Sequence, residues 1–114
     1  MSTTSTGRAA EDAAAEYLRT QGYKVLEQNW RTRYCEIDIV AQKGKTVSFV
    51  EVKYRKSDAY GSGLDYITPK KLQQMTFAAE MWVSNHSWNG DYTLAAVEVT
   101  GPSFQITNFL PDCT

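Results

Sequence analysis

Residues 36–53 read EIDIVAQKGKTVSFVEVK, and this stretch decides the fold. Its two halves, residues 36–41 and 47–53, are rich in β-branched residues and alternate with a period of two, and a short polar turn containing Gly44 separates them. Such alternation is typical of β-strands, and a glycine in a short connection favours a hairpin. The sequence therefore predicts an antiparallel hairpin whose strands each have one apolar face and one face that turns acidic far from the turn.

The register of this hairpin places charged side chains opposite one another. With Gly44 first in a two-residue turn, Asp38 lies opposite Glu51. The same register places Glu36 opposite Lys53. Opposed side chains start about 4.5–5.5 Å apart at Cβ, so three carboxylates and one amine gather at one place.

Facing carboxylates repel each other, so something must offset the repulsion. The candidates are a proton held by one acid, the Lys53 ammonium, or a divalent cation, for which hard oxygen ligands favour Mg²⁺ or Mn²⁺. An exposed sheet face whose acids and bases pair in solvent is the alternative. Because the two strands are too apolar for a fully solvated edge, we expect the acids in a partly enclosed part of the sheet.

The alanine-rich segment 7–22 predicts the first helix, after a disordered tail of residues 1–6. Gly22 stands where a C-terminal cap belongs. Glu11 shares a side of this helix with Leu18, on the face that should pack on the sheet. Its carboxylate either borders the buried stripe or points to the acidic cluster.

The second predicted helix, at residues 69–84, begins with a proline and has Thr68 as its cap. The polar segment 54–68 before it predicts a mobile loop beside the acidic face. The apolar side chains of this helix, Phe77 among them, are expected in the core. His86, the only histidine, is expected on the surface.

Segments 23–30, 92–99 and 104–109 predict three further strands. The element order is then helix, three strands, helix and two strands. Three consecutive strands favour an antiparallel meander, whereas a helix between the third and fourth strands permits a parallel crossover. We therefore predict an α/β protein with a mixed β-sheet flanked by helices.

A chain of 114 residues with 42% hydrophobic content predicts one domain, residues 1–114. No apolar run has membrane-spanning length, and the polar N-terminus lacks the features of a secretory signal, so we expect no membrane partner and a cytoplasmic location. Cys35 and Cys113 match neither a disulfide framework nor a zinc spacing, which predicts two reduced thiols.

The net charge of −1 and the pI near 5.8 give no overall basic footprint of the kind that nucleic-acid-binding proteins usually have. A local footprint remains open, because basic residues flank the hairpin and begin the second helix. The alternative is that most of them are solvated side chains that balance the acids. These residues are Arg31, Arg33, Lys53, Arg55, Lys56, Lys70 and Lys71.

An aspartate followed, a strand's length later, by Glu-x-Lys is similar to the signature of the restriction-endonuclease-like nuclease superfamily. Further motifs make the likeness specific, and in their order and spacing they resemble the YraN-like family of small bacterial proteins over about residues 7–100. One position departs from that pattern, because Cys35 stands where the family usually has glycine, which leaves less room beside the backbone. The motifs are Gly7-x-x-Ala10-Glu11, Tyr17-Leu18, Gly22-Tyr23-x-Val25-Leu26, Asn29-Trp30-Arg31, Glu36-Ile37-Asp38-Ile39, Phe49-Val50-Glu51-Val52-Lys53 and Arg55.

The resemblance implies a restriction-endonuclease-like core, with helix, three strands, helix and strand in that order, and a metal-dependent nuclease. Asp38 and Glu51, with Glu11 from the first helix, would bind Mg²⁺ or Mn²⁺, and Lys53 would act in catalysis. Glu36 would support this set by pairing with Lys53.

The expected partner is nucleic acid, DNA rather than RNA, in a branched or structured form, and a homodimer is one way to engage both strands. The residues expected to contact it are Arg31, Arg33, Arg55, Lys56 and Lys71. Two alternatives remain open: a binding module for nucleic acid or protein on the same fold, with weak or no catalysis, and a structural accessory protein.

Overall fold

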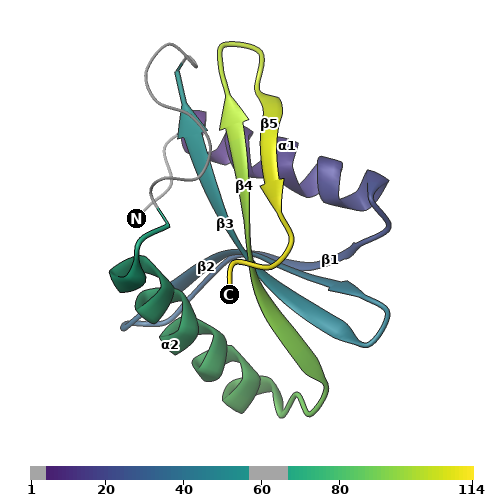
Figure 1. Cartoon of the computed structure of the whole chain (residues 1–114), viewed down its shortest axis with the longest axis vertical. Coiled ribbons are helices and arrows are strands. Elements are labelled where there is room, and N and C mark those ends of the chain that lie inside the picture. The colour runs from purple at the N-terminus through teal and green to yellow at the C-terminus, as the bar shows by residue number, and fades with distance from the viewer. Residues whose placement is uncertain (1–4, 57–66) are drawn as a thin grey trace.

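The computed structural model describes residues 5–56 and 67–114. One five-stranded sheet has the strand order β1-β2-β3-β4-β5, and helices α1 and α2 lie on opposite faces of it (Figure 1). The predicted α/β class with a mixed sheet flanked by helices is confirmed. The elements are α1 (Ser5–Thr20), β1 (Lys24–Arg31), β2 (Glu36–Lys43), β3 (Thr46–Arg55), α2 (Pro69–His86), β4 (Asp91–Thr100) and β5 (Gln105–Leu110).

The first three strands form an antiparallel meander, and β4 then pairs parallel with β3 and antiparallel with β5. The predicted register of the hairpin is confirmed, because Lys43 pairs with Thr46 and Ile39 with Val50. Gly44 has a φ of +63°, which is a left-handed conformation that suits glycine. The turn therefore fixes which side chains of β2 and β3 face each other.

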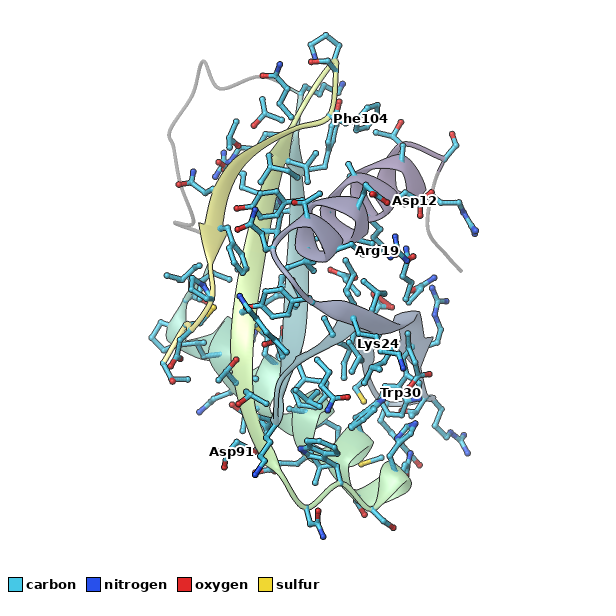
Figure 2. The ribbon with its side chains drawn as sticks, turned by 90° about the vertical axis from the view of Figure 1, so that its right-hand side faces the viewer. Asp12, Arg19, Lys24, Trp30, Asp91 and Phe104 are labelled. Atoms are coloured by element: carbon cyan, nitrogen blue, oxygen red, sulfur yellow. The ribbon has the colours of Figure 1, made fainter. Side chains whose placement is uncertain are left out.

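Two apolar clusters cover the two faces of the sheet. The cluster under α1 contains Leu18 with Ile39 and Val97, and Figure 2 shows Phe104 above the N-terminal part of that helix. The cluster under α2 contains Phe49 with Trp82, whose rings meet edge to face at 5.4 Å. Apolar side chains therefore cover both faces of the sheet.

The helix boundaries agree with the expected caps. Thr68 Oγ1 accepts a hydrogen bond from the Lys71 backbone N–H at 3.1 Å, and Gly22 ends α1 with a φ of +93°. The predicted N-terminal tail was too long, because α1 already begins at Ser5; residues 1–4 lie outside the described residues. Most of the loop predicted at 54–68 also lies outside them, since residues 57–66 are not described.

Two ring side chains of α2, Phe77 and His86, are exposed. Phe77 was expected in the core, but it is 48% exposed, because the buried stripe of α2 runs through Met75, Ala78 and Trp82 and Phe77 lies off it. His86 is exposed, as expected, yet it stacks on Trp82 at 4.0 Å. None of the helices in the described part of the chain is long and apolar enough to cross a membrane.

Candidate active site

The strands β2 and β3 separate at their acidic ends. Their pairing ends at Ile39 and Val50, while β2 stays paired with β1 as far as Glu36 and β3 stays paired with β4 as far as Arg55. Figure 1 shows the start of β2 leading toward α2 and the second half of β3 continuing beside β4. The gap that opens between them is where the sequence placed its acidic cluster.

Asp38 lies at the point of separation. Its Oδ2 accepts a hydrogen bond from the Val52 backbone N–H at 2.8 Å. In a continued ladder, a carbonyl of the neighbouring strand would supply this acceptor. The Asp38 carboxylate therefore supplies the acceptor that a backbone carbonyl of β2 would otherwise provide, and this hydrogen bond fixes its position beside β3.

A pocket of about 480 Å³ opens over this gap, between the two strands and α2. Glu36, Asp38 and Glu51 line it, together with Lys71 from the first turn of α2. Its volume lies within the range of about 300–1,000 Å³ typical of small-molecule sites. The structure thus gathers the three predicted strand acids in one solvent-connected hollow.

The surroundings of Asp38 favour its neutral form. Burial raises the pKa of Asp38 to about 7, and the nearby negative charge of Glu51 adds to this, while the Val52 N–H opposes it. Glu11 and Glu36 raise this pKa further through their charges. The predicted repulsion between the strand acids is therefore present, and a cation in the pocket would relieve it.

Lys71, in the first turn of α2, provides a positive charge beside these acids. Lys71 Nζ lies 2.9 Å from Glu51 Oε2. Lys53 lies two residues beyond Glu51 on β3, where its side chain is exposed, and the pocket lining does not include it. The expected pairing of Glu36 with Lys53 lies beyond the last paired residues of the hairpin.

Glu11 comes from the other side of the sheet. Its side chain is only 8% exposed, and burial, followed by the charges of Asp12 and Glu36, raises its pKa. It lines a separate hollow of about 250 Å³ between α1 and β1, where Gln28 Nε2 donates to Asp12 Oδ1 at 3.1 Å; Figure 2 labels Asp12 on α1. Glu11 therefore acts on Asp38 through its charge but does not share the pocket.

In residues 5–56 and 67–114, no three His, Cys, Asp or Glu side chains are grouped closely enough to hold a metal ion. The donor chemistry of the pocket still suits one, because Mg²⁺ is usually held by one or two carboxylates and completes its shell with water and substrate phosphate. Asp38 and Glu51 supply such a pair. A third protein carboxylate is not required.

The other predicted contact residues are spread over the molecule. Arg33 lies in the β1–β2 connection with its guanidinium 5.5 Å from the centre of the Tyr34 ring. Arg31 donates to Asn29 Oδ1 at 3.1 Å, and Lys56 is exposed just after β3. Arg55 donates to the buried Glu98 on β4.

Sequence reasoning missed several side chains of the pocket. Tyr34 lines it from the β1–β2 connection, beside Cys35, which the sequence had placed next to the site, and Gln73, Gln74 and Phe77 line it from α2. An aromatic residue within the basic polar segment 31–35 was a usable signal for Tyr34. No local pattern pointed to the α2 side chains, because their place depends on how the helix crosses the sheet. Both cysteines are free thiols, as predicted.

The fold and the site define the class of protein: an α/β protein compatible with a restriction-endonuclease-like core, with acids where two central strands separate. Residues 10–104 match the family described as Uncharacterised protein family UPF0102, and the chain belongs to this family. This confirms the resemblance to YraN-like proteins.

Individual members of the family are similar in sequence to this chain over most of their length. A UPF0102 protein of Vibrio campbellii is 38% identical over 96 residues, which cover 82% of this chain and 79% of the relative. One from Cytophaga hutchinsonii is 36% identical over 100 residues, covering 88% of each chain. One from Sulfurihydrogenibium sp. is 38% identical over 102 residues, covering 89% of each chain.

Proposed function

We propose that this protein is a metal-dependent nuclease that hydrolyses phosphodiester bonds in DNA. One observation carries the proposal: the carboxylates of Asp38 and Glu51 lie in a single open pocket at the point where two central strands of the sheet separate. Such a pair of hard, anionic oxygen donors suits Mg²⁺ or Mn²⁺. The restriction-endonuclease-like fold supports the same reading by analogy.

Each charged residue has a role in this proposal. When bound, the metal lowers the pKa of a water molecule and offsets charge on the phosphate. Asp38 and Glu51 would hold it, and the backbone of Val52 fixes Asp38 in place. Lys53 would stabilise the anionic transition state from β3. Lys71 would release Glu51 to the metal and turn to a substrate phosphate.

The pair formed by Lys71 and Glu51 also favours a second candidate function. An acid that is already neutralised by a lysine at 2.9 Å has less need of a metal. The same pocket would then serve a module that binds nucleic acid without cleaving it. Metal binding separates the two functions.

We expect saturating Mn²⁺ to raise the melting temperature of the wild-type protein by several degrees. A ligand at a hundredfold excess over its Kd stabilises a protein by about 2.7 kcal/mol, which shifts a domain of this size measurably. Asp38→Asn and Glu51→Gln should lose most of the shift, whereas Asp91→Asn, at an exposed position at the start of β4, should keep it. Differential scanning fluorimetry makes the comparison. Equal shifts in all four proteins would remove the metal site from the proposal.

We expect Lys71→Met to bind Mn²⁺ up to about fivefold more tightly than wild type, because a partly exposed ion pair that competes with the metal contributes up to about 1 kcal/mol. The matched control is Lys70→Met, since Lys70 is the exposed neighbour in the same helical turn. Isothermal titration calorimetry measures both affinities. If Lys71→Met binds Mn²⁺ no better than Lys70→Met does, the ion pair between Lys71 and Glu51 does not compete with the metal.

A further inference from the structure

Two exposed aromatic side chains stand at the pocket that holds the acids. Tyr34 is 70% exposed and Phe77 is 48% exposed. Among the described residues, the next most exposed large hydrophobic side chain is Tyr92, which is 37% exposed and whose ring packs edge to face on Phe49 at 5.4 Å. The two most exposed aromatic rings therefore line one and the same pocket.

These two rings come from different elements. Tyr34 projects from the β1–β2 connection, and its backbone N–H donates to Thr32 Oγ1 at 3.0 Å, which fixes the local turn. Phe77 projects from α2, outside the stripe that packs on the sheet. The acids Asp38 and Glu51 line the same hollow. A ligand in the pocket would thus meet aromatic faces and carboxylates together.

Exposed aromatic faces combined with cations are the usual means of binding single-stranded nucleic acid. Successive bases stack on the rings, and each stacked base contributes about 1–3 kcal/mol. A base inside a duplex is already stacked on its neighbours and offers no free face. The Arg33 guanidinium, 5.5 Å from the Tyr34 ring centre, adds a charge that can meet a phosphate beside the stacked base.

The charge of the whole protein points in the same direction. A duplex binder depends on many phosphate contacts, and a net charge of −1 provides little general attraction for phosphates. Stacking lessens that dependence, because its energy comes from the rings. A pocket of about 480 Å³ also has the size for a nucleotide and not for a duplex.

We infer that the pocket takes an unpaired nucleotide, whose base stacks on Tyr34 and Phe77 while its phosphate meets the cation that the acids would hold, so that the substrate class is single-stranded DNA or the unpaired end of a flap. This inference rests on the proposed function for the role of the acids. The stacking itself does not require catalysis. Binding and cleavage can therefore be tested separately.

The binding test uses a short oligo-dT strand with one central 2-aminopurine, alone and annealed to its complement, in Ca²⁺ buffer. Wild type should bind the single strand at least about tenfold more tightly than the duplex and quench its fluorescence by stacking. Tyr34→Ala and Phe77→Ala should each weaken single-strand binding about five- to a hundredfold, as loss of one stacked base predicts. Tyr92→Ala should bind as wild type does. Unchanged melting temperatures for the Tyr34 and Phe77 variants would show that both still fold.

The outcomes distinguish the inference from the proposed function. Single-strand binding that survives both substitutions, or duplex binding as tight as single-strand binding, overturns the inference even if Mn²⁺-dependent cleavage is found. Binding that depends on both rings, without cleavage in Mn²⁺, supports the inference and removes the nuclease. Loss of Mn²⁺-dependent cleavage of single strands in Tyr34→Ala but not in Tyr92→Ala would support both.

Discussion

Asp38→Asn is expected to lower Mn²⁺-dependent cleavage of a DNA oligonucleotide at least about 100-fold, the usual cost of removing a group that stabilises charge in a transition state. The amide keeps the shape of the carboxylate, and its oxygen can still accept the hydrogen bond from the Val52 backbone N–H. What the change removes is the negative charge. Initial rates on single-stranded and duplex oligonucleotides measure the effect, and Asp91→Asn serves as the control for one lost charge at an exposed position.

The same change should stabilise the metal-free fold, because Asp38 ionises at a cost. Its pKa is about 7 in the folded protein, raised first by burial and then by Glu51, against about 3.9 in an unfolded chain. The folded state therefore binds more protons between these two values, and the stability of wild type falls as the pH rises from about 4 to 7. Above pH 7 the cost is constant, and below pH 4 it vanishes.

In EDTA at pH 8, Asp38→Asn should be more stable than wild type by on the order of 2 kcal/mol, and the difference should shrink toward pH 4. Urea denaturation at a series of pH values measures it. A variant that loses both activity and stability at pH 8 would show that Asp38 serves the fold. A variant that gains stability and keeps its activity would remove Asp38 from the catalytic set.

The central hairpin was predictable because its determinants are local. Gly44 sets the turn, the turn sets the register, and period-two alternation sets the faces, so Asp38 and Glu51 could be placed on one side from sequence alone. The caps at Gly22 and Thr68 were local signals as well. The position of Phe77 was not, since the packing angle of α2 decides which side of that helix is buried.

The sequence predicted only those parts of the site that lie within the hairpin of β2 and β3. Where β2 and β3 part depends on the pairing of each with its outer neighbour, which no short stretch of sequence encodes. Lys71 meets Glu51 because α2 crosses the sheet there, whereas the sequence suggested Lys71 only as a contact for nucleic acid. The sequence suggested that Glu11 points to the acidic cluster. Because α1 packs on the face of the sheet opposite α2, Glu11 affects Asp38 through its charge but does not line the same pocket.

The pairing of β3 with β4 also brings Arg55 to Glu98, 43 residues away. Glu98 is 3% exposed, and its Oε2 accepts from Arg55 Nε at 2.5 Å. Its Oε1 accepts from Thr107 Oγ1 at 2.9 Å and from Asn108 Nδ2 at 2.8 Å. Donors from two neighbouring strands thus surround one buried carboxylate and tie β5 to the parallel pair.

Glu98→Gln should destabilise the protein by about 3 kcal/mol at pH 7, since removing one charge of a buried pair leaves the other uncompensated. The new amide would also turn its own N–H groups toward donors. The matched control is Glu16→Gln, which breaks the exposed pair with Arg19 at 3.3 Å and should cost under about 1 kcal/mol. Equal losses in the two variants would show that burial gives the Glu98 pair no special weight.

The pH dependence of this loss has the opposite sign to that of Asp38. Burial alone would raise the pKa of Glu98, but the hydrogen bonds from Asn108, Thr107 and Arg55, with the charge of Arg55, lower it below its usual value. The stability that the carboxylate provides is therefore complete above its unfolded pKa of about 4.3 and is lost as the pH falls through its lower folded pKa. Urea denaturation of wild type and Glu98→Gln should give curves that converge as the pH drops below about 4. If the difference in unfolding free energy between the two proteins stays constant with pH, the substitution destabilises the fold because the amide makes poor hydrogen bonds at this position, and not because the charge is lost.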